Sequence, residues 1–98
     1  MKARLSPTAL EDLDVILQFL ASQSPSAAAG FRDKFKQIRQ LLGVYPHGGR
    51  RTDQENLRYV NARPYPYLVF YDVIDDQAVI QRLIHGARNP LSMPGRPS

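Results

Sequence analysis

Residues 56–90 read NLRYVNARPYPYLVFYDVIDDQAVIQRLIHGARNP, and this stretch decides the fold. It contains an aromatic and β-branched run, Tyr67–Ile74, and a second apolar run, Ala78–His85. Such side chains favour half-buried strands, and the polar Asp75-Asp76-Gln77 between the runs favours a chain reversal. This turn has no glycine, so its type stays open. With the shorter run Leu57–Asn61, the stretch predicts a three-stranded antiparallel meander.

Alternation within the run Ala78–His85 predicts which of its side chains share a face of the sheet. Unless a bulge intervenes, one face carries Val79, Gln81, Leu83 and His85, and the other carries Ile80, Arg82 and Ile84. Because both faces carry aliphatic side chains, we expect this strand to be central and covered on both sides.

Two amphipathic helices are predicted before the strands. The first begins at Ser6-Pro7, where the serine oxygen can accept an early backbone N–H and the proline needs none, and it runs to about Ser22. Its apolar stripe recurs at helical spacing and consists of Leu10, Leu13, Leu17 and Leu20, with Ile16 beside it.

The second helix follows the segment Ser24-Pro25-Ser26, and the short connection predicts an antiparallel helix hairpin that packs on one face of the sheet. We expect this helix to end near Leu42, because Gly43 can adopt a left-handed cap conformation and a proline follows soon after. Gly30 within the helix can permit a close contact. The apolar stripe consists of Phe31, Phe35, Ile38, Leu42 and Tyr45.

The remaining segments carry weaker signals. Lys2–Leu5 can supply an edge strand, whereas His47–Arg51, which reads HGGRR, is predicted as a plain loop because no GK[ST] follows its glycines. Residues 1–90 are expected to form a single domain, and residues 91–98 a flexible tail rich in proline, serine and glycine.

The composition excludes several kinds of site. The chain of 98 residues contains no cysteine and no tryptophan, so it has neither disulfides nor thiolate metal ligands. His47 and His85 are isolated in the sequence, so we expect no metal and no cofactor. No window reaches the length of a membrane span, which predicts a soluble, cytoplasmic protein without a membrane partner.

The net charge is +4 and the isoelectric point is near 9.8. Arginines supply all of the basic charge in the second half of the chain, at positions 50, 51, 58, 63, 82, 88 and 96. The planar guanidinium group suits phosphate or carboxylate, which favours a polyanionic or acidic partner. Surface solubility explains the same charge equally well.

Several local sequences together resemble the RelE/ParE superfamily of toxins from prokaryotic type II toxin–antitoxin systems. The resemblance covers nearly the whole chain, and its most specific parts are Arg58, the run Pro66–Tyr71 and the terminal segment His85–Arg88. It implies an α+β fold, in which an N-terminal helix hairpin packs on a small, largely antiparallel β-sheet in the order β-α-α-β-β-β. It also implies a cognate antitoxin whose C-terminal part wraps the toxin surface.

The superfamily contains two activities. Its ParE-like members bind DNA gyrase and block its cycle without chemistry of their own, and ParD-like antitoxins neutralise them. Its RelE-like members are endoribonucleases that cleave mRNA in the ribosome.

The ribonuclease alternative requires a proton-transferring group beside cations. His85 is the candidate acid or base, because histidine titrates near neutral pH. The residues that would offset charge on the phosphate are Arg58, Arg63 and Arg88, and those that would stack on bases are Tyr65, Tyr67 and Tyr71. However, no lysine follows Lys36, and a histidine at a strand end more often has a structural role.

The chain resembles ParE-like toxins more closely, because its helix hairpin is long and regular and its histidine-containing strand end precedes a short tail. On this interpretation no residue is catalytic. The candidate target-binding residues are Arg58, Arg63, Tyr71, Arg82, His85 and Arg88, together with the segment 88–98. The antitoxin is expected to use the helix hairpin and an exposed sheet edge.

Overall fold

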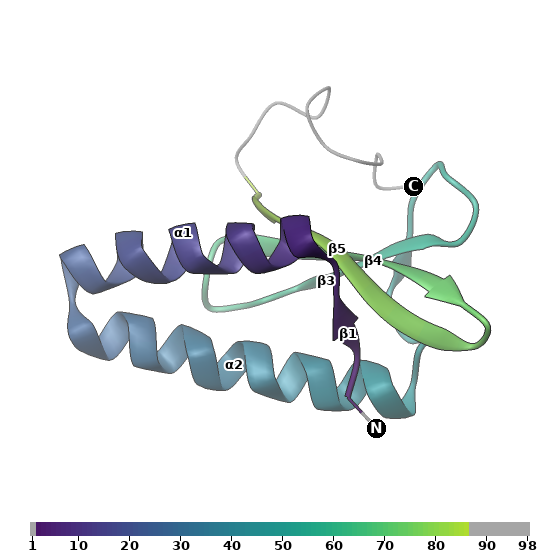
Figure 1. The fold of residues 1–98 in the computed structure, drawn as a ribbon, viewed down its shortest axis with the longest axis horizontal. Helices are drawn as coiled ribbons and strands as arrows, with labels where there is room; N and C mark the ends of the chain where they lie inside the picture. The colour runs from purple at the N-terminus through teal and green to yellow at the C-terminus, as the bar shows by residue number, and fades with distance from the viewer. Residues whose placement is uncertain (1, 87–98) are drawn as a thin grey trace.

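A helix hairpin covers one face of a five-stranded sheet in the computed structural model of the protein, which describes residues 2–86 (Figure 1). This arrangement confirms the predicted α+β fold. The elements are, in chain order, β1 (Arg4–Leu5), α1 (Pro7–Gln23), α2 (Pro25–Val44), β2 (Arg50–Arg51), β3 (Leu57–Asn61), β4 (Tyr67–Ile74) and β5 (Gln77–His85). Neither helix is long and apolar enough to cross a membrane within this part of the chain.

The strand order in the sheet is β1-β5-β4-β3-β2. The pairs β2–β3, β3–β4 and β4–β5 are antiparallel, which confirms the predicted meander, whereas the edge strand β1 runs parallel to β5. The prediction of a plain loop at His47–Arg51 was wrong in part. Arg50 and Arg51 pair with Tyr59 and Arg58 of β3 and add a short second edge strand that the predicted element order lacked.

The turn between β4 and β5 consists of Asp75 and Asp76, whose φ angles are 51° and 60°. Positive φ at both central residues is the requirement of a type I′ turn, whose twist matches that of the flanking strands. Aspartate tolerates this conformation because its short polar side chain can hydrogen-bond locally, so the turn forms without glycine.

A bulge in β5 changes the predicted faces of this strand. Phe70 of β4 pairs with Arg82, but the next residue, Tyr71, pairs with Ile80, so Gln81 is the extra residue. Beyond the bulge the alternation is shifted by one. Ile80 therefore shares the helix side of the sheet with Leu83, and the prediction that Ile80 lies with Ile84, and Val79 with Leu83, was wrong.

Helix α1 begins as predicted. The Ser6 hydroxyl oxygen accepts the Ala9 N–H at 3.1 Å, and proline follows at the first helical position. Its predicted apolar stripe is wrong at Leu10, which is 54% exposed, whereas Ala9 is fully buried. The sheet-facing side uses the small Ala9 because the helix start lies directly beside β5, where the Ser6 N–H donates to the Ile80 carbonyl at 2.8 Å.

Helix α2 follows after the single residue Ser24, which ends α1 and precedes Pro25. It continues through Gly43 to Val44, so the predicted left-handed cap at Gly43 is wrong, and no glycine in residues 2–86 has positive φ. The stripe of Phe31, Phe35, Ile38 and Leu42 is buried as predicted, but Tyr45, just beyond the helix, is 62% exposed. Gly30 faces the Tyr65 hydroxyl, which confirms the close contact expected there.

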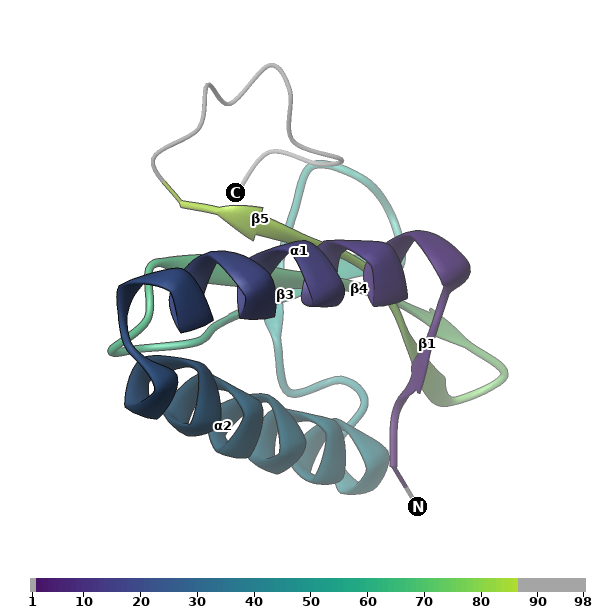
Figure 2. The same ribbon diagram turned by 60° about the vertical axis from the view of Figure 1, so that its left-hand side comes forward.

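The main core lies between the helices and the sheet, and Figure 2 shows both helices on this side. Phe31 is its centre, with its ring edge-on to Tyr65 and Tyr67 at centroid distances of 5.3 Å. A smaller cluster of Leu57, Phe70 and Ile84 lies on the opposite, helix-free face. Aliphatic side chains of β5 therefore contribute to clusters on both faces, as predicted.

Candidate functional site

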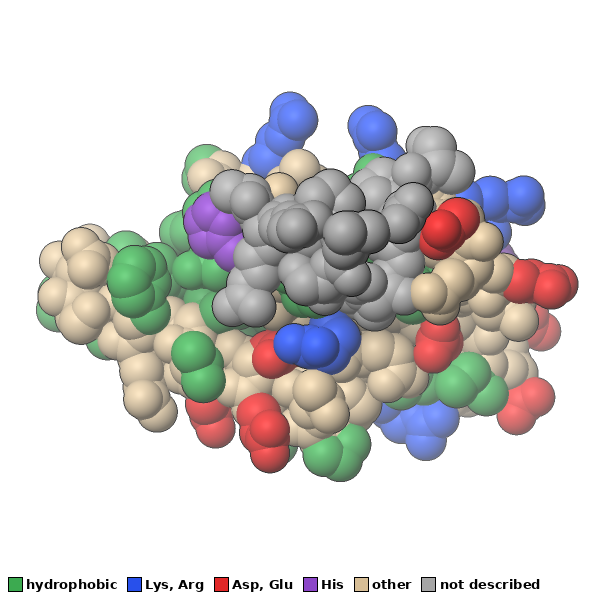
Figure 3. Space-filling view, turned by 90° about the horizontal axis from the view of Figure 1, so that it is seen from above, with side chains coloured by type: hydrophobic (Ala, Val, Ile, Leu, Met, Phe, Trp, Pro, Cys, Tyr) green, Lys and Arg blue, Asp and Glu red, His purple; other side chains and the backbone are tan. Residues whose placement is uncertain are grey.

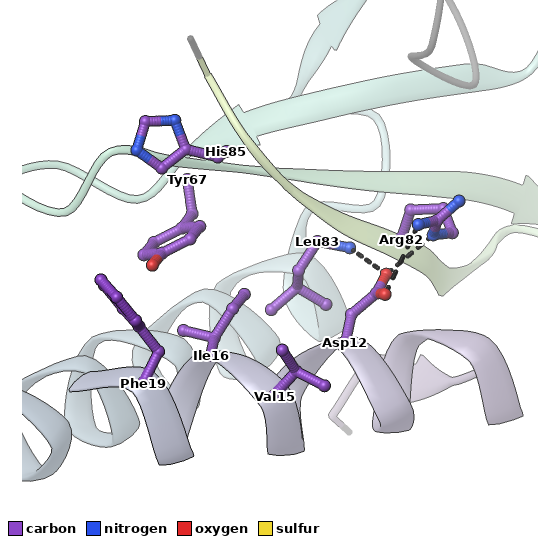
Figure 4. Close-up of a pocket in the computed structure, with 8 residues that line it drawn as sticks. All are labelled: Asp12, Val15, Ile16, Phe19, Tyr67, Arg82, Leu83 and His85. Carbon is purple, nitrogen blue, oxygen red and sulfur yellow. Dashed lines mark hydrogen bonds and ion pairs between the residues drawn. The ribbon is translucent and has the colours of Figure 1, made fainter. Parts of the chain in front are cut away.

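A groove of about 490 Å³ runs between α1 and β5 (Figure 4). The helix supplies Asp12, Val15, Ile16 and Phe19, and the strands supply Tyr67, Arg82, Leu83 and His85. The apolar side chains of this set form most of the surface, while Asp12 and Arg82 lie together at one end. We call this feature the α1–β5 groove.

Helical spacing brings the α1 residues to the same side. Positions three, four and seven apart lie on one face of a helix, so Asp12, Val15 and Phe19 line up along the groove. Val15 is 66% exposed and Phe19 is 55% exposed. Large apolar side chains exposed beside a groove are typical of a surface that binds another molecule.

The Asp12 carboxylate closes the end of the groove. Its Oδ2 accepts the Arg82 Nε–H at 2.7 Å and the Leu83 backbone N–H at 3.0 Å. Charge-assisted bonds of this kind are stronger than neutral ones. Asp12 therefore ties α1 to β5 beyond the point where β1 ends.

His85 lies at the other end of the groove. It is opposite Tyr67 in the β4–β5 ladder, and the two rings meet edge to face with a centroid distance of 5.5 Å. His85 and Arg82 lie on opposite faces of β5, as predicted, because no bulge separates them. A histidine packed against a tyrosine at a strand end has a structural role available to it.

Arg58 and Tyr71 form a separate, internal contact. They are opposite each other in the β3–β4 ladder; the Tyr71 hydroxyl accepts the Gly49 N–H at 2.8 Å, and Arg58 Nη1 donates to the Gly49 carbonyl at 3.0 Å. Tyr71 is fully buried, so its prediction as a target-binding residue was wrong. Its side chain instead holds the loop before β2 against the core.

Burial raises the pKa of Tyr71, although the Gly49 N–H and the Arg58 guanidinium act in the opposite direction, and burial also raises the pKa of Tyr67. The unfolded chain therefore loses these protons at lower pH than the folded chain. We expect the free energy of unfolding to fall as the pH rises above about 10, the ordinary tyrosine value, and these groups to have no effect below it. Denaturant unfolding at a series of alkaline pH values measures this slope. Replacing Tyr67 with phenylalanine should make the slope shallower, and an unchanged slope would contradict the assignment.

Arg63 is exposed in the β3–β4 connection, and Arg88 lies outside the described residues, as do the tail and the domain boundary at residue 90. Figure 3 shows lysine and arginine side chains at several separate places on the visible part of this face rather than gathered in one patch.

A second, polar hollow of about 530 Å³ lies at the β2–β3 end of the sheet. Arg51, Arg58, Asp53 and Glu55 are among its lining residues, so both signs of charge are present. No group of three or more histidine, aspartate or glutamate side chains in residues 2–86 is placed to hold a metal ion.

Sequence reasoning missed the groove residues Asp12, Val15 and Phe19. A signal was present, because Val15 and Phe19 are apolar residues four apart that lie off the predicted leucine stripe. Their significance depends on β5 lying beside that side of α1, which only the tertiary structure shows.

Residues 3–90 match the family model of the ParE toxin of the type II toxin–antitoxin system parDE. No curated protein matches the chain. Among solved structures, the fold is similar to a chain of the chromosomal ParDE system from P. aeruginosa, with a TM-score of 0.73 and 22% sequence identity. That match covers 87% of this chain and 95% of the other.

Proposed function

Because the chain belongs to the ParE toxin family of type II toxin–antitoxin systems, we propose that it inhibits DNA gyrase and that a cognate ParD-like antitoxin neutralises it. The proposal places the toxin in the cytoplasm, with its target. The α1–β5 groove is the surface on which the antitoxin docks. The exposed apolar side chains of Val15 and Phe19 beside this groove are the observation that carries the docking assignment.

The groove suits a protein segment rather than a charged small molecule. Its wall is largely apolar, and the Asp12–Arg82 ion pair at its end is already internal to the toxin. A partner can bury Phe19 and Val15 against its own apolar side chains, and each fully buried large apolar side chain contributes about 1.5–3 kcal/mol before the costs of association.

The described positions of Arg58 and Arg82 count against the ribonuclease alternative. A ribonuclease site needs a proton-transferring group and a cation on one phosphate. Arg58 and His85 both lie on the helix-covered face of the sheet. The residues that pair with them in β4, Tyr71 and Tyr67, are four residues apart, which corresponds to a distance of roughly 13 Å along the strand. Arg82 is nearer in the chain, but it lies on the other face of the sheet and is bound to Asp12.

The test of the proposed activity is a plasmid supercoiling reaction with purified gyrase. We expect the toxin to inhibit supercoiling or to trap cleaved plasmid, and the antitoxin to restore activity. A translation reaction containing the same toxin, in which mRNA length is followed, is the control. Ribosome-dependent mRNA cleavage with unaffected gyrase would overturn the proposal and would make His85→Ala the variant to measure next.

A further inference from the structure

A cleft of about 310 Å³ lies between α1 and α2, which run side by side in Figures 1 and 2. We call it the α1–α2 cleft. Its lining consists of three apolar side chains, Leu13, Leu17 and Phe35, and four basic ones, Lys2, Arg32, Lys36 and Arg39. Among the residues that the structure describes, no aspartate or glutamate lines it, and none of its residues lines the α1–β5 groove. The cleft therefore carries charge of one sign.

Helical spacing arranges the basic side chains of α2 in a row. Arg32, Lys36 and Arg39 are four and three residues apart, so they lie on one side of the helix. At a rise of 1.5 Å per residue, they are spread over roughly 10 Å along its axis. Arg32 and Lys36 are exposed, and Arg39 is half-buried. The row is a strip of positive charge along one side of α2.

Two hydrogen bonds place Lys2 at the end of this row. The Ala3 N–H donates to the Arg39 carbonyl at 2.9 Å, and Arg39 Nε donates to the Ala3 carbonyl at 2.9 Å. These bonds fix the N-terminal segment beside α2, so Lys2 lines the same cleft as Arg39. Within residues 2–86, the Arg39 side chain uses only its Nε in a hydrogen bond, which leaves both terminal nitrogens of the guanidinium to a partner.

The charges of the row are not neutralised within the described chain. No ion pair among residues 2–86 involves any of the four basic side chains of the cleft. Asp33 directly follows Arg32, but successive helical residues point in different directions, and Asp33 does not line the cleft. Like charges three or four residues apart on a helix repel each other, so a partner of opposite charge relieves this repulsion.

We propose that the α1–α2 cleft binds the phosphate backbone of DNA, and that its occupant in the cell is the DNA segment held by gyrase. The inference rests on the proposed inhibition of gyrase, an enzyme that acts on DNA, and it adds a second contact to that complex. Duplex DNA presents about one negative charge per 1.7 Å of its axis, which complements a row of cations without carboxylates.

The apolar wall of the cleft favours DNA over an acidic protein segment. Phe35 is only 4% exposed, and Leu13 and Leu17 are partly buried and pack against the main core. An apolar anchor of a protein partner would therefore find little free surface to cover, and such anchors supply most of the affinity of protein interfaces. The charged ends of the lysine and arginine side chains are the accessible groups, and phosphate is the group that they suit.

Binding of the toxin to a fluorescently labelled DNA duplex, measured by anisotropy at a series of salt concentrations, tests this inference. Each phosphate contact contributes about −0.9 to the slope of log K against log salt concentration, so we expect a slope of roughly −3 to −4 for the four cations. The double variant Arg32→Gln/Lys36→Gln should have a slope shallower by about 1.8 and an affinity at least roughly tenfold weaker at physiological salt.

Lys34→Gln is the matched control, because Lys34 carries the same charge on the same helix but does not line the cleft. Its slope should equal that of the unmodified toxin. Since Arg32 and Lys36 are exposed, the urea unfolding midpoint of the double variant should also be unchanged. A toxin that does not bind DNA, or equal slopes for the toxin and both variants, would overturn the inference.

A supercoiling reaction separates this inference from the proposed function. We expect half-inhibition of gyrase to require at least roughly tenfold more of the double variant than of the unmodified toxin or Lys34→Gln. If all three proteins inhibit equally, the cleft does not hold gyrase-bound DNA, while gyrase inhibition stands. If the unmodified toxin leaves gyrase active, the proposed function itself fails. Weaker binding of the double variant to DNA-free gyrase, with unchanged binding to DNA, would make the occupant an acidic protein surface and contradict the inference.

Discussion

Replacing Gly49 with alanine is expected to destabilise the toxin by about 2–4 kcal/mol, which combines the cost of overpacking with that of a lost buried hydrogen bond. A Cβ atom at this position would collide with the Tyr71 hydroxyl and lie 2.7 Å from Tyr71 Cε1 and 2.9 Å from the Tyr59 carbonyl oxygen. Tyr71 is fully buried and cannot swing away, and the Tyr59 carbonyl belongs to β3. The loop carrying Gly49 would therefore have to move.

Movement of this loop also breaks its two hydrogen bonds. The Gly49 N–H would lose the Tyr71 hydroxyl, and its carbonyl would lose Arg58. The alanine also restricts the unfolded chain, which opposes the loss by only about 0.4–1 kcal/mol. Since small domains are stable by about 5–15 kcal/mol in total, the change should be plain in a urea unfolding curve.

Gly48 is the matched control for this prediction. It precedes Gly49 in the same loop, but a Cβ there meets only the Tyr45 carbonyl oxygen at 3.2 Å and the Tyr45 Cβ at 3.5 Å. Tyr45 is mostly exposed and lies beyond the helix, so small adjustments are available to it. We expect Gly48→Ala to shift the midpoint of urea unfolding much less than Gly49→Ala does. If both alanine variants are destabilised equally, the contact between residue 49 and Tyr71 does not determine the stability of this loop.

The strands could be predicted from the sequence because their information is local. The run Tyr67–Ile74 forms β4 with the predicted bounds, since β-branched and aromatic residues between a proline-rich connector and a polar turn leave little alternative. The Ser6-Pro7 start of α1 was equally clear, because a cap and a proline act on the first turn alone. Each of these signals lies within a few residues of the structure that it specifies.

The errors arise where one element meets another. The bulge at Gln81 has no local signature, and it reverses the faces of Val79 and Ile80 relative to the end of β5. Hydrophobicity alone predicted that Leu10 rather than Ala9 would be buried against the sheet. The close approach of α1 to β5 favours the smaller side chain at this place. The groove has the same origin, because its apolar wall matters only once α1 and β5 are neighbours.

Replacing Phe19 with aspartate is expected to abolish antitoxin binding while the toxin stays folded. Phe19 is 55% exposed, so a charge there removes little core packing. In the complex, the same carboxylate would be buried against apolar surface, which is costly for an unpaired charge. Removal of a central aromatic anchor by itself costs 2 kcal/mol or more in many interfaces, so we expect affinity to fall by at least roughly a hundredfold. Titration calorimetry of the purified proteins measures this change.

Leu10→Asp is the control, because Leu10 has the same exposure, 54%, on the same helix but does not line the groove. It introduces the same charge and should leave the affinity unchanged. In cells, Phe19→Asp toxin should still arrest growth, and co-expressed antitoxin should fail to rescue it, whereas Leu10→Asp toxin should be rescued. If the two variants bind the antitoxin equally well, the groove is not the docking surface. If only Leu10→Asp loses binding, the antitoxin docks on the other side of α1.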